Sequence, residues 1–307
     1  MSSVTGQAHW TTKKTPDGEV RLYLWEKYVG SPEGKPAILW VHGSSMASTP
    51  TFDLTVPGRP DSSVMDWFAE RGFTNWCVDM EGYGRSDKHR DISCDISNGA
   101  DDLAAATDYI RATRGIESFL AYGISSGALR AALFAQRYPE RISRLALDAF
   151  VWTGEGAPTL AQRRKKLPEF LAARRRPIDR AFVYSIFERD HPDCAERRVV
   201  DAFADAILAL DDSMPNGTYI DMCSRLPVVD PAKITMPTLV MRGQFDGIAA
   251  MDDLIEFFKR LPSPDKQFSV MNGISHASFQ QKNYQLVYQI LHAYFTQPAP
   301  AYTSIGH

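Results

Sequence analysis

The sequence predicts an α/β protein with a mostly parallel sheet, covered by helices on both faces, and an inserted helical subdomain. Short continuous apolar runs alternate with longer segments of helical periodicity, which indicates a parallel sheet. The apolar runs do not alternate with polar residues, as expected of strands that are buried on both faces. One long stretch between two of the runs is cut by prolines and lacks any strand pattern.

The elements follow in order along the chain. The segment from His9 to Val29 alternates around Asp17-Gly18, which predicts a leading antiparallel hairpin. Apolar runs predict parallel strands at residues 37–41, 73–79, 118–122, 144–150, 237–241 and 267–271. Helical periodicity predicts helices at residues 62–71, 98–113, 126–138, 252–261 and 281–296.

The stretch from about Thr153 to Lys233 contains seven prolines and no predicted strand. We therefore expect a core of residues 1–152 and 236–307, with residues 153–235 forming a helical cap. Within it, Leu160 to Arg180 holds eight basic residues against two acidic ones. Such a run is either a solvated helix face or a positive rim that attracts anionic substrates.

Composition narrows the classes of function. The formal net charge of −3 gives no reason to expect nucleic acid as a partner. No apolar run approaches the ~20 residues that span a bilayer, and the polar N-terminus lacks the pattern of a secretion signal. The four cysteines have no CxxC spacing, so we expect reduced thiols, a cytoplasmic location, and no metal or cofactor. The sequence does not indicate an oligomeric state.

The segment Gly123-Ile124-Ser125-Ser126-Gly127 joins an apolar run to a predicted helix. A serine between two glycines at such a corner is typical of a nucleophile elbow. Side chains at positions 123 and 127 would collide in a corner this sharp, which explains both glycines. The corner would expose the Ser125 hydroxyl at the carboxyl edge of the sheet. The alternative is a glycine turn that closes an ordinary βα unit.

A nucleophilic serine needs a histidine base within hydrogen-bond reach. His276 lies in a loop just after the last predicted strand, at the edge where catalytic groups gather. We expect His276 to be the base. His191 falls in the predicted cap and His292 falls inside the last helix, where other roles are expected.

The histidine in turn needs a carboxylate to orient it. Asp246 follows the predicted strand at residues 237–241 and lies in a glycine-flanked loop, so it is the predicted acid. Asp148, late in the preceding strand, is an alternative acid. Asp252 and Asp253 begin a predicted helix, where an aspartate is expected to cap the helix.

An oxyanion formed on acyl attack needs two backbone N–H donors. Ser126, directly after the nucleophile, is expected to supply one donor. The loop His42-Gly43-Ser44-Ser45 follows the first parallel strand, and the Ser44 N–H is the second predicted donor. His42 is expected to anchor this loop. The alternative for this segment is a generic βα turn.

Taken together, these motifs resemble the α/β-hydrolase superfamily, in its cap-bearing serine esterase branch. Val41-His42-Gly43-Ser44 is similar to the family's oxyanion loop, and Asp79 to Asp87 is similar to its D-x-x-G-x-G-x-S turn, which is structural. The resemblance covers roughly residues 20–150 and 235–296, with the serine, acid and histidine in the family's order. The segment Ser45 to Pro60 is longer than usual in the family, and we expect it to narrow the pocket.

The resemblance implies a serine hydrolase without cofactors that cleaves a carboxylic ester through an acyl-enzyme intermediate. The expected partner is a small to medium apolar or aromatic ester, and a monoester with a free carboxylate is a further refinement of this expectation. Met46, Trp152 and Phe182 are predicted to line the pocket, with ordinary core packing as the alternative for each. Lactonase, amidase, carbon–carbon bond hydrolase and perhydrolase activities use the same triad. A non-catalytic ligand receptor on this fold is the alternative from another class.

Overall fold

A computed structural model describes residues 3–302 and contains one eight-stranded sheet within them, in the order β1-β2-β4-β3-β5-β6-β9-β10. The leading hairpin pairs β1 (Val4–Thr15) with β2 (Gly18–Val29), and β2 pairs antiparallel with β4. The remaining pairs are parallel and join β3 (Ala37–Val41), β4 (Thr74–Val78), β5 (Phe119–Ile124), β6 (Ile142–Asp148), β9 (Thr238–Gly243) and β10 (Lys266–Met271). The predicted α/β class and mostly parallel sheet are confirmed.

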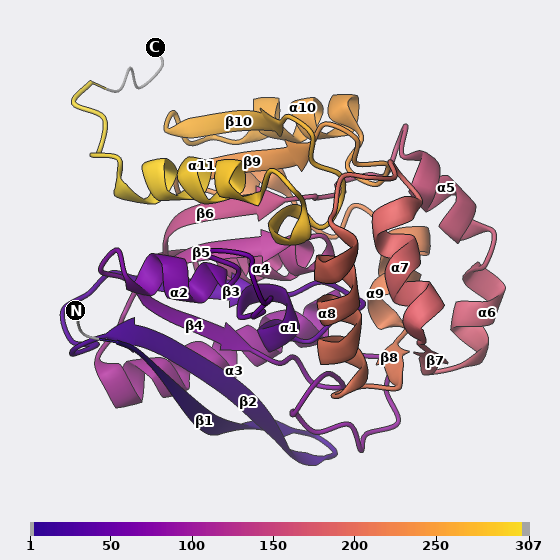
Figure 1. The fold of residues 1–307 in the computed structure, drawn as a ribbon, viewed down its shortest axis with the longest axis horizontal. Helices are drawn as coiled ribbons and strands as arrows, with labels where there is room; N and C mark the ends of the chain where they lie inside the picture. The colour runs from indigo at the N-terminus through magenta and orange to yellow at the C-terminus, as the bar shows by residue number, and fades with distance from the viewer. Residues whose placement is uncertain (1–2, 303–307) are drawn as a thin grey trace.

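Helices cover both faces of the sheet (Figure 1). One face carries α2 (Val64–Ala69) and α11 (Tyr284–Thr296), and the other carries α3 (Ile96–Arg114), α4 (Ser126–Arg137) and α10 (Met251–Arg260). Short 3₁₀ turns lie at Pro139–Arg141, Pro231–Lys233 and Ser278–Gln280.

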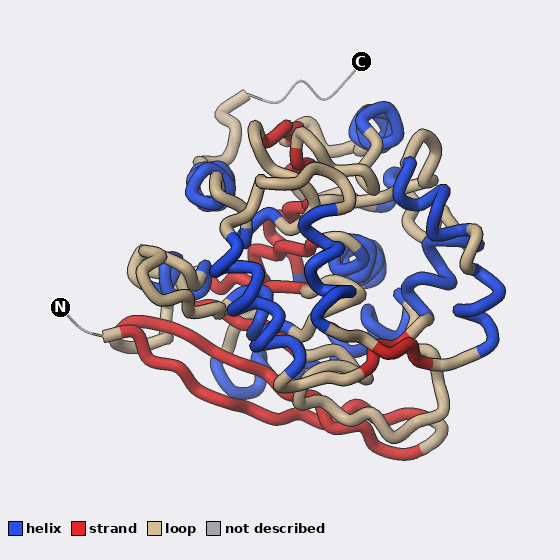
Figure 2. Tube along the Cα trace, turned by 45° about the vertical axis from the view of Figure 1, so that its right-hand side comes forward, coloured by secondary structure: helices blue, strands red, loops and turns tan. Residues whose placement is uncertain are grey.

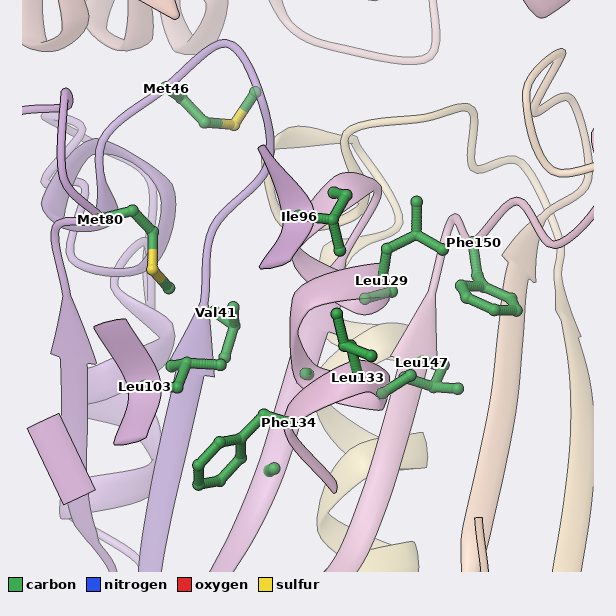
Figure 3. Close-up of a cluster of buried hydrophobic side chains, with 14 of the residues drawn as sticks. Val41, Met46, Met80, Ile96, Leu103, Leu129, Leu133, Phe134, Leu147 and Phe150 are labelled. Carbon is green, nitrogen blue, oxygen red and sulfur yellow. The ribbon is translucent and has the colours of Figure 1, made fainter. Parts of the chain in front are cut away.

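The strand β3 shows why the sequence lacks alternation. All of its residues are buried, and they divide between two apolar clusters. Ile38 and Trp40 pack on the α2 and α11 side, whereas Val41 packs with Leu103 and Leu129 on the α3 and α4 side (Figure 3). Both faces of the strand are therefore dry, and every position must be apolar.

Between β6 and β9 the chain forms a group of helices at the carboxyl ends of the parallel strands (Figures 1 and 2). They are α5 (Pro158–Arg164), α6 (Leu167–Ala172), α7 (Arg180–Glu188), α8 (Arg197–Leu208) and α9 (Gly217–Ser224).

The expectation that this segment contains no strand is wrong. Strands β7 (Arg175–Pro177) and β8 (Ser213–Pro215) form a two-stranded antiparallel sheet. Three residues are too few to show a period of two, and each strand ends in proline. Two arginine side chains add bonds between these strands. Arg175 Nη2 donates to the Ser213 carbonyl at 2.6 Å, and Arg176 Nη1 donates to the Pro215 carbonyl at 2.7 Å. No sequence pattern indicates such side-chain bonds.

The segment after the first parallel strand contains a short helix, α1 (Ser48–Phe52), that the sequence did not predict. The Asp79 carboxylate holds the start of this helix, since Oδ1 accepts bonds from Ser48 N at 2.8 Å and Ser48 Oγ at 2.5 Å. Its Oδ2 accepts the Arg85 amide at 2.9 Å, so one buried side chain ties α1 to the glycine-rich turn.

No helix among residues 3–302 is long and apolar enough to cross a membrane. All four cysteines (Cys77, Cys94, Cys194 and Cys223) are free and buried.

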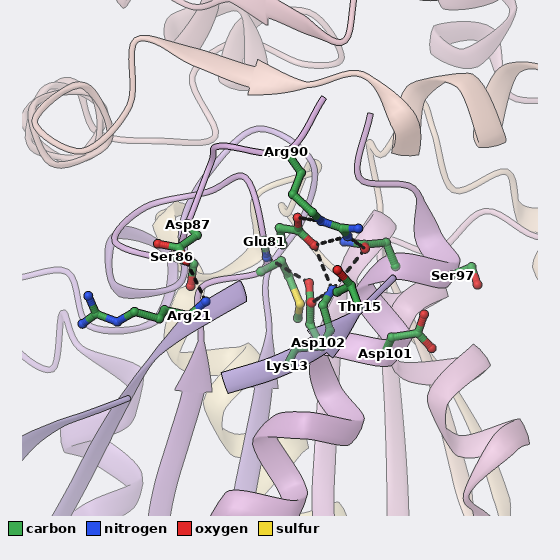
Figure 4. A network of polar contacts seen from close by, with 12 residues as sticks. Lys13, Thr15, Arg21, Glu81, Ser86, Asp87, Arg90, Ser97, Asp101 and Asp102 are labelled. Atoms are coloured by element: carbon green, nitrogen blue, oxygen red, sulfur yellow. Dashed lines mark hydrogen bonds and ion pairs between the residues drawn. The ribbon is translucent and has the colours of Figure 1, made fainter. Parts of the chain in front are cut away.

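A buried charge network joins the leading hairpin to α3 and to the turn that follows β4 (Figure 4). Lys13 Nζ of β1 donates to Glu81 Oε2 at 2.8 Å and also bonds Asp102 of α3. Arg90 Nε donates to the other Glu81 oxygen at 2.6 Å, and the Glu81 amide donates to Asp102 at 2.9 Å. Every charge in the network faces an opposite charge, which compensates for its removal from water.

Replacing Lys13 with methionine keeps the apolar stem but leaves buried Asp102 without its cation. We expect Lys13→Met to lower the free energy of unfolding by about 3–5 kcal/mol. Asp101→Ala is the control, because the adjacent Asp101 pairs with Arg137 while 56% exposed and should cost less than about 1 kcal/mol. Urea unfolding followed by circular dichroism measures both losses, and equal losses would contradict the role of the network.

Candidate active site

The corner between β5 and α4 places Ser125 at the carboxyl edge of the sheet. Its backbone has φ of 58° and ψ of −125°, a strained conformation for a residue with a side chain, and its N–H donates to the Asp148 carbonyl at 2.8 Å. A Cβ at Gly123 would overlap the Gly127 carbonyl, and a Cβ at Gly127 would overlap the carbonyl oxygens at the end of β3. Both glycines therefore allow backbone contacts that no other residue permits.

Three side chains from separate strand ends meet at this corner. His276 Nε2 lies 3.0 Å from Ser125 Oγ, and His276 Nδ1 lies 3.0 Å from Asp246 Oδ2. The second Asp246 oxygen accepts the amides of Ile248 at 2.8 Å and Ala249 at 3.1 Å. The structure thus brings together the nucleophile, base and acid that the sequence predicts.

The charge of Asp246 determines the tautomer of His276. Burial alone would raise the pKa of Asp246, but the charge of His276 and the bonds from His276, Ile248 and Ala249 outweigh burial and hold this pKa below its usual value. An ionised carboxylate can only accept, so His276 Nδ1 carries a proton. Its Nε2 is then free to accept the proton of Ser125.

The alternative acids occupy other positions. Asp148 accepts the Tyr122 hydroxyl at 2.6 Å, and burial raises its pKa to about 6. Asp253 accepts the amides of Trp152, Thr153 and Gly154 at 3.0–3.1 Å, which holds the start of the 153–235 segment. Asp252 is exposed in the first turn of α10. The hydrogen bond from His276 goes to Asp246.

Two buried side chains, the His42 ring and the Arg130 guanidinium, hold the backbone of the predicted oxyanion loop. His42 Nε2 accepts the Met80 amide at 3.0 Å, and its Nδ1 donates to the Gly43 carbonyl at 2.8 Å. Burial, followed by the charge of Arg130, lowers the pKa of His42 to about 3, so the ring is neutral. Arg130 Nη1 donates to the His42 carbonyl at 3.0 Å and to the Gly43 carbonyl at 3.4 Å.

These bonds orient the Ser44 amide. In a planar trans peptide the carbonyl and the N–H point in opposite directions. The Gly43 carbonyl accepts bonds from His42 and Arg130, so the Ser44 N–H of the same peptide points away from both side chains. Ser44 Oγ donates to Ser126 Oγ at 2.6 Å, which ties the loop to the first turn of α4. Within residues 3–302 the Ser44 and Ser126 amides donate to no protein acceptor, so both are available to an oxyanion.

A small cavity opens on Ser125 and His276. Met46 and Ile124 form apolar walls together with Ile186 of α7. The Ser45 to Pro60 segment contributes Ser45, Met46 and Thr51 to this wall.

Two predicted pocket residues lie elsewhere. Trp152 packs against Phe257 and donates its indole N–H to the Val229 carbonyl at 3.1 Å, so it closes the base of the 153–235 segment. Phe182, on α7, is not among the side chains that line the cavity. The residue types were suitable, but the direction of a side chain on a segment without a motif depends on helix packing.

Sequence reasoning missed three polar side chains that line the cavity. Arg163 of α5, Arg189 at the end of α7 and Tyr219 of α9 all face the space in front of Ser125. Arg163 belongs to the basic run at residues 160–180, whereas Arg164, Lys165 and Lys166 are exposed. One residue of the basic run, Arg163, therefore lines the cavity, and its three neighbours form a solvated face.

Among the described residues, no group of three or more His, Cys, Asp or Glu side chains is arranged to hold a metal ion.

Comparisons with known proteins identify relatives of this chain. A family model described as serine aminopeptidase, S33, matches residues 58–283. A proline iminopeptidase from Neisseria meningitidis is 25% identical over 281 residues, which cover 80% of this chain and 85% of that relative.

Solved structures share the fold. An esterase from Thermogutta terrifontis has a TM-score of 0.68 at 21% identity, over 94% of this chain and 98% of its own. The 2-hydroxy-6-oxo-6-phenylhexa-2,4-dienoate hydrolase of Rhodococcus sp. strain RHA1 has a TM-score of 0.66 at 18% identity, over 95% and 100% of the two chains. At these identities the likeness shows a common fold and does not define the substrate.

Replacing Asp246 with asparagine should make Ser125 a poorer nucleophile. The asparagine amide can donate to His276 Nδ1, which favours the tautomer with its proton on Nε2, and that nitrogen can then no longer accept the Ser125 proton. We expect Asp246→Asn to slow labelling of Ser125 by a fluorophosphonate roughly a thousandfold or more. Asp148→Asn is the matched control, since asparagine still accepts the Tyr122 hydroxyl, and should slow labelling by less than about tenfold. Intact-mass kinetics measure both rates. A larger effect at Asp148 would assign the acid to β6.

Proposed function

The chain belongs to the serine aminopeptidase, S33, family of α/β-hydrolases, and we propose that it is a carboxylic ester hydrolase acting through an acyl-enzyme. The observation that carries the proposal is the hydrogen-bonded set Ser125, His276 and Asp246, which opens on a cavity lined by arginine and lacking any lining carboxylate among the described residues.

The geometry supports each step of the reaction. Ser125 Oγ attacks the ester carbonyl while His276 Nε2 takes its proton, and Asp246 stabilises the resulting imidazolium. The amides of Ser44 and Ser126 bind the oxyanion. His276 then protonates the departing alcohol, and a water molecule repeats the sequence on the acyl-enzyme to release the acid.

The charge of the cavity favours an ester over a peptide with a free amino terminus. An aminopeptidase binds a substrate whose terminal amine is protonated at neutral pH, and burying that cation requires an anionic partner. Arg163 and Arg189 line this cavity, and no aspartate or glutamate does so within residues 3–302. Two guanidinium groups repel a substrate ammonium group, whereas an ester needs no such charge.

We also propose that the 153–235 segment acts as a cap over Ser125. It contributes Arg163, Ile186, Arg189 and Tyr219 to the cavity wall. It is tied to the core at several points, since Arg175 Nη1 donates to the Gly82 carbonyl and the Ile96 amide donates to Asp221, each at 2.9 Å.

Aminopeptidase activity is the second candidate, favoured by the family description and by the proline iminopeptidase relatives. An anilide of an amino acid with a free amine separates the two functions from each other. The remaining alternatives that share this triad are lactonase, carbon–carbon bond hydrolase and perhydrolase activities, and a non-catalytic ligand receptor.

The decisive experiment is a hydrolysis panel with Ser125→Ala as the control. We expect nitrophenyl esters to be hydrolysed, and lactones, prolyl anilide and vinylogous diketones to be hydrolysed much more slowly. A fluorophosphonate should label the wild type at Ser125 and leave Ser125→Ala unlabelled by intact mass. Faster turnover of prolyl anilide would assign the protein to the peptidases. A protein that is not labelled and hydrolyses nothing would be a receptor.

A further inference from the structure

The cavity in front of Ser125 contains positive charge that the described part of the chain does not neutralise. Arg163 lies with its guanidinium 4.0 Å from the centre of the Tyr219 ring, and within residues 3–302 it forms no ion pair with a carboxylate. Arg189 has one acidic neighbour, Asp190, at 3.5 Å. Of the two guanidinium groups that line the cavity, only that of Arg189 is paired with a carboxylate.

A third arginine, Arg176, bonds the protein backbone and does not face the cavity. Arg176 donates to the Ser44 carbonyl at 3.0 Å, to Ser45 Oγ at 3.1 Å and to the Pro215 carbonyl at 2.7 Å. Its Nη1 and Nη2 groups bond the oxyanion loop and β8, and Arg176 does not line the cavity. Arg163 and Arg189 are therefore the cations available to a bound molecule.

Tyr219 lies at the centre of this cluster. The guanidinium groups of Arg163 and Arg176 lie 4.0 and 3.7 Å from its ring centre, and its hydroxyl lies 3.1 Å from Ser45 Oγ. Burial alone would raise the pKa of Tyr219, but Arg163, Arg176 and Arg189 together lower it to about 7. The Tyr219 phenolate can therefore balance part of the charge of Arg163, which pairs with no carboxylate within residues 3–302.

We propose that Arg163 and Arg189 bind a carboxylate carried by the substrate, so that the preferred substrates are monoesters with a free carboxylate. This inference rests on the proposed ester hydrolase function. A guanidinium group matches a carboxylate with two parallel N–H···O bonds. The pairing is stronger in a partly enclosed cavity than at the open surface, and Ser125 lines the same cavity to attack the ester end.

The test compares two esters of equal length, nitrophenyl hydrogen glutarate and nitrophenyl pentanoate. We expect the wild type to prefer the anionic ester in kcat/KM by roughly 10- to 100-fold, mainly through KM. Arg163→Met and Arg189→Met should each lower this preference, and Arg163→Lys should keep part of it. Acetoxybenzoate, which carries its carboxylate on the leaving group, reports which side of the ester the arginines hold.

Arg164→Met is the matched control. Arg164 neighbours Arg163 in sequence, is exposed and does not line the cavity, so its loss should leave the preference unchanged. Equal use of both esters by the wild type, or equal effects of Arg163→Met and Arg164→Met, would overturn the carboxylate site while leaving the esterase intact. Turnover of neither ester would instead reject the proposed function. If the arginine variants fail to fold, competitive inhibition of the wild type by glutarate, and not by pentanamide, decides the question.

A bound carboxylate should also change the protonation of Tyr219. The groups that face Tyr219 are Arg163 of α5, Arg176 of β7, Arg189 after α7 and the hydroxyl of Ser45, and His276 lines the same cavity. A substrate anion cancels part of the positive charge, so the pKa of Tyr219 rises and the phenolate takes up a proton. Above the pKa of about 7 in the free protein, binding must supply this proton, and affinity for the anion falls.

We therefore expect the preference for the anionic ester to decrease as the pH rises from 6 to 9, by up to about tenfold per pH unit above the Tyr219 pKa. Taking the ratio of the two esters removes any pH effect on the catalytic steps that both esters share. Tyr219→Phe should abolish the pH dependence of the ratio. A preference that stays constant with pH in the wild type would show that Tyr219 is not the balancing charge.

Discussion

The close backbone contact between the elbow and the end of β3 is the constraint on which the site depends. Gly127 lies against the carbonyl oxygens of Val41 and His42, so α4 begins directly beside the oxyanion loop. This contact forces Ser125 into a strained conformation that aims its hydroxyl away from the sheet. The strain is maintained because the sheet supports both sides of the corner, with the Ser125 amide bonded to the Asp148 carbonyl of β6. A rigid sheet thus supplies the preorganisation that oxyanion binding requires.

Two arginines, Arg130, which is buried, and Arg176, which is half-buried, extend that preorganisation outward from the corner. Arg130 pulls the carbonyls of His42 and Gly43 away from Ser125, and Arg176 holds the next carbonyl, that of Ser44. Neither arginine forms an ion pair among the described residues, so each depends on neutral oxygen acceptors. The buried charge of Arg130 is costly to remove from water. Two backbone carbonyls accept bonds from its guanidinium, which offsets part of that cost.

The two parts of the chain contribute different properties to the site. The sheet and its flanking helices position Ser125, His276 and Asp246, which are the groups that any acyl transfer needs. The 153–235 segment supplies Arg163, Arg189 and Tyr219 to the cavity wall, where we propose that they select the charge of the substrate. A fold shared with relatives at about 25% identity does not by itself define the substrate.

The sequence by itself determined the sheet, the helices that cover it, and the strand ends at which Ser125, Asp246 and His276 lie. These features follow from local patterns: dry strands must be apolar throughout, and a sharp corner needs glycine on both sides. Only the tertiary structure decided that His276 bonds Asp246 and that Asp148 instead binds Tyr122. It also placed Arg163 in the cavity, Trp152 outside it, and formed β7 and β8. Those outcomes depend on the orientation in which each helix packs against distant segments. A local sequence pattern does not predict that orientation.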